Sequence, residues 1–214
     1  MSDQEKRMAA RRALALVKSG MVLGLGTGST AAHFIRMVGE LEGENSLGLR
    51  CIATSVASEN LASECGLELV GFGEVDAIDL AVDGADVIVG KNLIKGLGGG
   101  AIAREKAVDY RARKFVVIAD RTKVKEVFGG VVPVEVLKFS SEAVRRELLG
   151  MGAENAEYRG GKERFVTDNG NFMLDAVFGK IARPEEMERE LNNIPGVVEN
   201  GIFTKECELI VGGV

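Results

Sequence analysis

Short apolar runs of strand length alternate with helical segments through the first 120 residues, and this alternation is the strongest constraint on the fold. The runs that we expect to form strands lie at residues 21–25, 49–54, 77–82 and 115–119. The helices expected after the first three runs lie near residues 30–38, 57–65 and 101–110. The alternation predicts an α/β fold, with a Rossmann-like parallel sheet that carries helices on both of its faces.

The pattern changes after about residue 128, where strands are expected to follow one another more closely. A strand at 131–136 is expected to precede a helix at 141–151, short strands near 153–158, 164–167 and 171–177, and a helix at 184–191. This order predicts a smaller α+β domain, which is ferredoxin-like. We expect residues 1–128 and 204–214 to form the Rossmann-like domain, with segment 208–211 rejoining its sheet, and residues 129–203 to form the small domain.

Composition narrows the class of protein. The formal net charge is −5, which argues against a general attraction to nucleic acid. No apolar run approaches the roughly 18 residues of a membrane span, and the N-terminus is a charged helical pattern that does not resemble a signal peptide. We therefore expect a cytoplasmic protein that binds neither nucleic acid nor a membrane.

Metal and disulfide chemistry are not expected. The three cysteines, Cys51, Cys65 and Cys207, are widely spaced and contain no C-x-x-C pair. His33 is the only histidine, and it is expected to be a packed or hydrogen-bonded helix residue. Acid and base chemistry must then come from carboxylates, assisted by lysines.

The segment Gly26-Thr27-Gly28-Ser29-Thr30 follows the first predicted strand and opens a helix. Backbone N–H groups, the helix dipole and three hydroxyls meet there, so we expect it to bind an anion. With Ala31 the segment also satisfies the G-x-G-x-x-G/A pattern of dinucleotide sites, and a purely structural turn is a third alternative. The next strand ends at Thr54 and Ser55, which suit phosphate or sugar hydroxyls, whereas a ribose diol requires an acid there.

The turn Asp83-Gly84-Ala85-Asp86 comes directly after a buried run, so both carboxylates are expected at the carboxyl edge of the sheet. They could bind a metal, orient sugar hydroxyls or cap the turn. Hydroxyl binding is favoured over magnesium because Lys95 already supplies positive charge.

The segment from Lys95 to Lys106 places a run of glycines between a cation and the carboxylate of Glu105, which lies about one turn into the expected helix. A plain glycine-rich turn before a surface helix is the alternative. Lys123 follows the 115–119 strand and is expected either to reach the same pocket or to be a solvated surface lysine.

These motifs, in this order, resemble type A ribose-5-phosphate isomerase across nearly the whole chain. The segments that carry the resemblance are 26–30, 83–86, 95–106, 119–123, Pro-Val-Glu-Val at 133–136 and Val-Thr-Asp-Asn-Gly-Asn at 166–171. The resemblance implies an aldose-ketose isomerase of the non-oxidative pentose phosphate pathway. It would interconvert D-ribose 5-phosphate and D-ribulose 5-phosphate through an enediolate, without a cofactor or a metal, as a homodimer or homotetramer.

The resemblance also implies the roles of individual residues. Glu105 would transfer the proton between carbons, Asp83 would shuttle it between oxygens, and Lys95 would stabilise the enediolate. The expected substrate-binding residues are Thr27, Gly28, Ser29, Thr30, Ser55, Asp83, Gly84, Ala85, Asp86, Lys95, Gly96, Gly98 and Lys123. In this chain Leu97 interrupts the family's glycine run, which leaves open which of Gly98, Gly99 and Gly100 contacts substrate.

Two other functions are alternatives to the isomerase and can be distinguished from it by experiment. The first is a non-catalytic sugar-phosphate-sensing domain, which needs the phosphate loop but no base, so the presence of both Glu105 and Lys95 argues against it. The second is an NAD-dependent dehydrogenase, which the absence of an acid after the second strand disfavours.

Overall fold

The computed structural model describes residues 3–213, which form two compact units. Among the described residues, the first unit consists of 3–85, 104–123 and 206–213. The second consists of Asp86–Ala103 and Val124–Lys205. Within residues 3–213, no helix combines the length and the apolar composition needed to cross a membrane.

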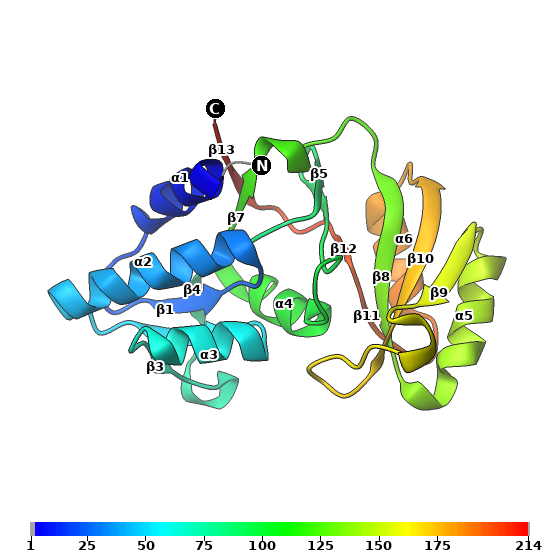
Figure 1. The fold of residues 1–214 in the computed structure, drawn as a ribbon, viewed down its shortest axis with the longest axis horizontal. Helices are drawn as coiled ribbons and strands as arrows, with labels where there is room; N and C mark the ends of the chain where they lie inside the picture. The colour runs from blue at the N-terminus through cyan, green and yellow to red at the C-terminus, as the bar shows by residue number, and fades with distance from the viewer. Residues whose placement is uncertain (1–2, 214) are drawn as a thin grey trace. The chain divides into compact units, whose positions relative to one another are not determined.

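The first unit is built on a six-stranded sheet in which all neighbouring strands are parallel (Figure 1). In spatial order its strands are β13 (Glu208–Gly212), β7 (Ala112–Asp120), β4 (Ile78–Asp83), β1 (Val22–Leu25), β2 (Arg50–Ala53) and β3 (Glu68–Leu69). The parallel sheet confirms the predicted α/β class. The expected return of the chain's end to this sheet is also confirmed, since β13 pairs with β7.

Helices cover both faces of this sheet. The helices are α1 (Asp3–Leu14), α2 (Ser29–Asn45), α3 (Val56–Glu64) and α4 (Ile102–Asp109), with 3-10 turns at Phe72–Glu74 and Arg121–Lys123. On one face α1 and α2 pack together (Figure 1), and Leu23 and Leu25 share a buried core with Phe34 of α2. Gly24 points to the other face, where a Cβ atom would lie 2.5 Å from Val108 Cγ1 of α4. The alternation of side chains along β1 therefore places α4 opposite α2.

The second unit contains a four-stranded antiparallel sheet and two helices. In spatial order the strands are β11 (Val197–Asn200), β8 (Gly129–Val136), β10 (Phe172–Lys180) and β9 (Asn155–Tyr158). The helices are α5 (Ser141–Gly150) and α6 (Pro184–Asn192), and 3-10 turns occupy Lys138–Ser140 and Gly161–Glu163. The chain order of strand, helix, two strands, helix and strand is the predicted ferredoxin-like arrangement.

A smaller antiparallel sheet also belongs to the second unit. It consists of β12 (Ile202–Phe203), β6 (Asn92–Ile94) and β5 (Val87–Val89). Residues 86–103 therefore group with the second unit, and so do 124–128 and 204–205, whereas the sequence pattern predicts all of them in the Rossmann-like domain. The physical reason is the pairing of Leu93 and Ile94 with Phe203 and Ile202, which joins segments more than a hundred residues apart.

The predicted strand at 164–167 is wrong. Only Val166 forms a bridge there, with Phe172, and a 3-10 turn precedes the segment. Phe165 and Val166 are 37% and 47% exposed, so the apolar side chains that suggested a strand do not enter a core.

Candidate active site

The loop between β1 and α2 has the geometry of an anion site. Gly28 adopts φ 101° as the N-cap of α2, a conformation that glycine reaches without strain. Its carbonyl accepts the hydrogen bond of Ala32 N–H at 2.9 Å. The first turn of α2 carries no acidic residue, so its backbone N–H groups and its dipole favour an anion.

Hydroxyl groups stiffen this loop through a chain of hydrogen bonds. Thr27 Oγ1 donates to Ser55 Oγ at 2.8 Å, Ser55 Oγ donates to Ser58 Oγ at 3.0 Å, and Ser58 Oγ donates to the Gly26 carbonyl at 2.7 Å. Ser55 also caps α3 by accepting from Ser58 N–H. Thr27 and Ser55 thus have structural partners, and their contact with a substrate stays a prediction.

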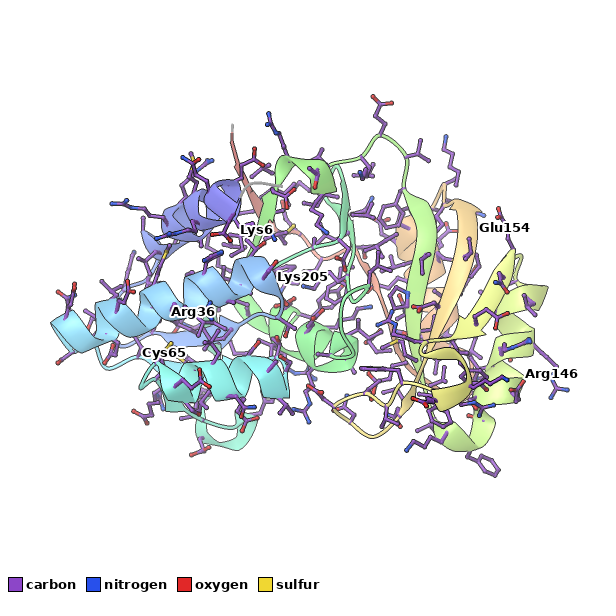
Figure 2. All side chains as sticks on the ribbon, in the orientation of Figure 1. Lys6, Arg36, Cys65, Arg146, Glu154 and Lys205 are labelled. Carbon is purple, nitrogen blue, oxygen red and sulfur yellow. The ribbon has the colours of Figure 1, made fainter. Side chains whose placement is uncertain are left out.

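Lys6 of α1 is a residue that the sequence reasoning missed. Its Nζ donates to Ser29 Oγ at 2.8 Å, which brings a cation to the start of α2 (Figure 2). No motif surrounds Lys6, and only the packing of α1 against α2 reveals it.

The carboxylate of Asp120 interacts electrostatically with Lys6 and with Lys123, a predicted substrate-binding residue. This carboxylate is buried at the end of β7 and accepts hydrogen bonds from both the amide and the hydroxyl of Thr122. Burial raises the pKa of Asp120, but the Thr122 hydrogen bonds and the charges of Lys123 and Lys6 outweigh it and lower the pKa below its ordinary value. The ionised carboxylate therefore shares its surroundings with two cations.

Asp83 lies at the end of β4 and is fully buried. Its Oδ1 accepts hydrogen bonds from Thr27 N–H at 2.8 Å and from Gly84 N–H at 2.6 Å. A Cβ atom on Gly26 would lie 2.2 Å from the same oxygen, so only glycine fits there. The anion loop and the carboxylate turn, two motifs far apart in the sequence, are thus one structural assembly.

Glu105 lies in the first turn of α4 and is 5% exposed. Neighbouring Ile102 is completely buried and fixes the start of the helix against the core. Backbone N–H groups at a helix start favour a negatively charged side chain, and the role of Glu105 as the base stays a prediction.

Asp86 and Lys95 belong to the second unit, at the two ends of the β5–β6 hairpin. Asp86 N–H donates to the Ile94 carbonyl at 2.8 Å, and Lys95 N–H donates to the Gly201 carbonyl at 2.9 Å. Lys95 is 2% exposed, with Nζ 5.3 Å from the ring centroid of Phe203. The cation–π contact lowers the cost of burying this ammonium group.

The glycines after Lys95 serve different purposes. Gly96 has φ 90°, and a Cβ atom there would lie 2.0 Å from Ile102 Cγ2. A Cβ atom on Gly100 would lie 2.3 Å from Phe165 Cε1. A Cβ atom on Gly98 or Gly99 would meet nothing within 4 Å. Packing therefore requires Gly96 and Gly100, whereas Gly98 and Gly99 leave open space.

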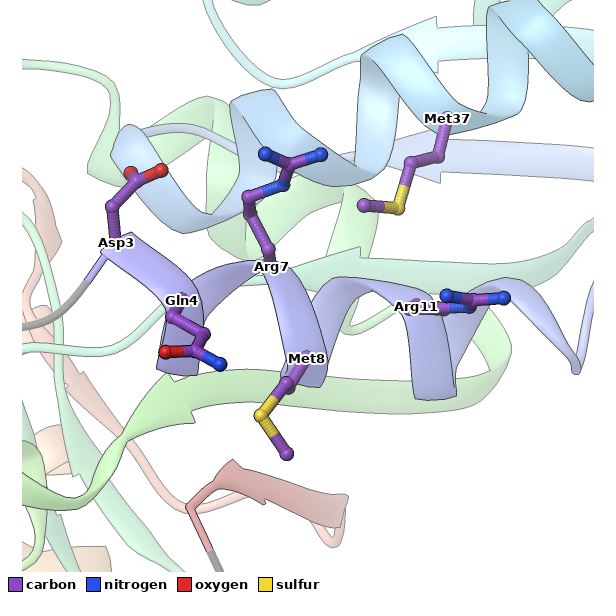
Figure 3. Close-up of a pocket in the computed structure, with 6 residues that line it drawn as sticks. All are labelled: Asp3, Gln4, Arg7, Met8, Arg11 and Met37. Carbon is purple, nitrogen blue, oxygen red and sulfur yellow. The ribbon is translucent and has the colours of Figure 1, made fainter.

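Two pockets in the first unit differ in their relation to the predicted residues. The first adjoins the anion loop between α2 and α3 and is lined by Gly28, Ser29, Ala32, Ile35, Arg36, Ala57, Ser58, Asn60, Leu61 and Glu64. The second lies between α1 and α2 and contains none of the predicted site residues (Figure 3); it is lined by Asp3, Gln4, Arg7, Met8, Arg11 and Met37.

The structure places His33 on α2, where its Nε2 pairs with Asp3 Oδ1 at 2.9 Å, so this histidine has a structural partner.

Metal ligands do not gather in the part of the chain that the structure describes: no group of three or more His, Cys, Asp or Glu side chains there could hold an ion. No disulfide joins Cys51, Cys65 or Cys207 in the described part of the chain. Burial raises the pKa of Cys51 to about 12, so this thiol is not a nucleophile at neutral pH.

The fold and these residues define an α/β protein in which a glycine- and hydroxyl-rich loop at a helix start is joined to a buried carboxylate. The family described as Ribose 5-phosphate isomerase A (phosphoriboisomerase A) matches residues 50–214. A ribose-5-phosphate isomerase A from Methanosarcina acetivorans is 44% identical over 212 residues, covering 97% of this chain and 90% of the relative. The chain belongs to the ribose 5-phosphate isomerase A family, as its motifs predicted.

Solved structures agree with this assignment. Ribose 5-phosphate isomerase A from Methanocaldococcus jannaschii superposes with a TM-score of 0.92 at 44% identity, covering 97% of this chain and 94% of that one. A D-ribose-5-phosphate isomerase in complex with phospho-erythronic acid superposes with a TM-score of 0.94 at 42% identity, covering 99% and 96%. The predicted fold class is confirmed for both units.

Proposed function

We propose that this chain interconverts D-ribose 5-phosphate and D-ribulose 5-phosphate through an enediolate. The observation that carries this proposal is the similar isomerase that was solved with phospho-erythronic acid. That compound has a phosphate at one end and a carboxylate at the other. The two carboxylate oxygens share a negative charge, as the oxygens of an enediolate do.

The reaction moves one proton between neighbouring carbons. A base removes the C2 proton of the aldose, the electron pair forms the C1–C2 double bond of the enediolate, and the proton returns to C1 while the C2 oxygen becomes the carbonyl. We assign the base to Glu105. A positioned base contributes typically ~10²- to 10⁴-fold in rate.

Stabilising the negative charge of the enediolate and moving the proton between its two oxygens are separate tasks, which we assign to different residues. We assign Lys95 to stabilising the enediolate, since its ammonium group is held by the Phe203 ring and by the pairing of β6 with β12. Asp83 is assigned to moving the proton between O1 and O2, with Asp86 orienting sugar hydroxyls. The two backbone N–H donors on Asp83 Oδ1 support this role, because they hold one oxygen in place and keep the carboxylate oriented.

The phosphate is assigned to the segment 27–30 at the start of α2. The helix start supplies backbone N–H groups, and Lys6 and Lys123 supply positive charge. These contacts exist in substrate and transition state alike, so they contribute to affinity more than to the chemical step.

The decisive experiment combines turnover with isotope exchange. Glu105→Gln keeps the shape of the side chain but cannot accept a proton, so kcat should fall by roughly 10²- to 10⁴-fold with KM little changed. In D₂O the variant should also stop introducing deuterium at C1 or C2. Glu126→Gln, a change at an exposed glutamate, is the matched control and should behave like the parent. Near-normal turnover by Glu105→Gln would refute the assignment of the base.

We also propose that the protein acts in the cytoplasm as a homodimer or homotetramer, without a cofactor and without nucleic acid or membrane partners. The net charge of −5 and the family resemblance support this. Light scattering coupled to size-exclusion chromatography measures the assembly, and a monomeric mass would contradict it.

A further inference from the structure

Arg159, which no motif identified, makes four hydrogen bonds within the second unit. It follows β9, and its side chain has a 15% exposed fraction. Nε and Nη2 donate to the two oxygens of Asp175 on β10, at 3.0 and 2.5 Å. Nη1 donates to the Gly96 carbonyl at 2.7 Å and also to the Gly99 carbonyl. One guanidinium group therefore joins the four-stranded sheet to the glycine turn that follows Lys95.

The ion pair with Asp175 determines where the guanidinium points. A bidentate carboxylate holds a planar guanidinium in both position and orientation. The remaining donors of Nη1 then face two carbonyls of the same turn, three residues apart. Asp175 thus orients Arg159, and Arg159 draws together the two ends of the 96–99 turn.

The same contact reaches Asp86 through one peptide group. A trans peptide is planar, so its C=O and N–H point in opposite directions. In the peptide that joins Gly96 to Leu97, the carbonyl accepts from Arg159, and the N–H donates to Asp86 Oδ2 at 2.9 Å. A continuous series of contacts therefore runs from Asp175 through Arg159 and this peptide to Asp86.

The turn has few other means of keeping its conformation. Gly98 and Gly99 contribute no side chains, and Leu97 is 38% exposed. Gly96 must hold φ 90°, and glycine by itself has no preference for that conformation over others. Hydrogen bonds to the backbone, rather than side-chain packing, must then select the conformation of the turn.

We propose that Arg159 is a positioning residue for the isomerisation: it fixes the turn at 96–99 so that Lys95 and Asp86, on either side of it, keep their working orientation. The four hydrogen bonds of its guanidinium go to Asp175 and to the turn, so its effect on catalysis is indirect. This inference rests on the proposed function, because it assigns Arg159 an effect on catalysis through those two residues.

The test compares Arg159→Ala with Arg164→Met. Arg164 is a matched control, since it lies in the same unit, stacks 3.9 Å from the centroid of the Tyr158 ring and pairs with Glu142, yet no hydrogen bond joins it to the turn. Arg159→Ala should lower kcat about 10- to 100-fold, the scale of a misplacement near 1 Å. KM should stay within about twofold, because the phosphate is assigned to residues of the first unit. Arg164→Met should keep the parental kcat.

Two further measurements separate positioning from loss of fold. Millimolar guanidinium ion should restore part of the kcat of Arg159→Ala, and it should not restore Glu105→Gln. Amide hydrogen exchange should become faster in the peptide covering residues 95–102, while the strands of the four-stranded sheet stay protected. If Arg159→Ala does not fold, Arg159→Lys keeps the charge without the bidentate fork and should show the same loss of kcat.

An unchanged kcat in folded Arg159 variants would overturn the proposal, as would a rise in KM alone or an equal loss of kcat in Arg164→Met. Amide hydrogen exchange can be measured even if the protein has no isomerase activity, so it tests the role of Arg159 independently of the proposed function. If the parent protein did not convert ribose 5-phosphate, the proposed function would fail. Unchanged exchange in the 95–102 peptide of Arg159→Ala would separately refute the claim that Arg159 holds the turn.

Discussion

The glycine turn provides a sharp test of the structure through the pair Gly96→Ala and Gly98→Ala. Both substitutions add one methyl group, and the two glycines are two residues apart. Gly96 has φ 90°, and its added Cβ would lie 2.0 Å from Cγ2 of Ile102, a side chain that is completely buried. Gly98 has no positive φ, and its added Cβ would meet nothing within 4 Å.

The expected cost of Gly96→Ala follows from these two features. A left-handed conformation costs an L-residue roughly 1–2 kcal/mol, and overpacking a buried site typically costs about 1–3 kcal/mol. The free energy of unfolding should therefore fall by about 2–5 kcal/mol, a large part of the ~5–15 kcal/mol typical of a folded domain. Gly98→Ala should change it by no more than about 0.5 kcal/mol, as for an open surface position.

Urea unfolding monitored by far-UV circular dichroism measures both variants against the parent. A clearly lower midpoint for Gly96→Ala and an unchanged midpoint for Gly98→Ala are expected. Equal midpoints for Gly96→Ala and the parent would refute the reasoning, since the methyl group would then have found space that the structure does not show. Isomerase assays of folded Gly98→Ala additionally report whether a ligand uses the open space at that glycine.

Three further predictions concern binding, pH and metals. Lys6→Met and Lys123→Ala should each raise KM for ribose 5-phosphate more than they lower kcat, and a collapse of kcat at constant KM would move that lysine into the chemical step. Asp120 has a lowered pKa in the folded state, so it contributes stability that is complete above its ordinary pKa near 3.8 and is lost as the pH falls below it. The difference in unfolding midpoint between the parent and Asp120→Asn should accordingly shrink below about pH 4; a constant difference from pH 3 to 7 would contradict this. Dialysis against a strong chelator should leave activity intact, and restoration of a lost activity by magnesium or zinc would require Asp83 and Asp86 to be reassigned as metal ligands.

The parallel sheet could be predicted because each buried strand has a local signature. Apolar runs such as 77–82 and 115–119 are long enough to fill a strand, and helical spacing between them indicates the covering helices. The small sheet of β5, β6 and β12 could not be predicted in the same way. Its strands have two or three residues each, too few to show a period, and β12 joins them only by pairing with β6, which lies more than a hundred residues away along the chain.

The error at 164–167 has a related cause. The apolar pair Phe165 and Val166 suggested a buried strand, but the backbone there bonds within a local turn: Phe165 N–H donates to the Arg159 carbonyl at 2.7 Å and Thr167 N–H donates to the Asn171 carbonyl at 2.9 Å. The ring of Phe165 instead occupies the space beside Gly100. Its apolar character thus serves a contact with the glycine turn.

The sequence by itself determined the fold class and the family, because the motifs that carry them are local properties of the chain. The roles of Glu105, Asp83 and Lys95 are predictions that the family resemblance implies. Only the tertiary structure brought Lys6 to Ser29 and Arg159 to the glycine turn. The physical reason is that a hydrogen bond requires two atoms to lie about 3 Å apart in space, and the spacing of residues along the sequence does not show which distant residues meet this condition. These two cations lie 23 and 63 residues from their partners along the chain, and folding alone joins them.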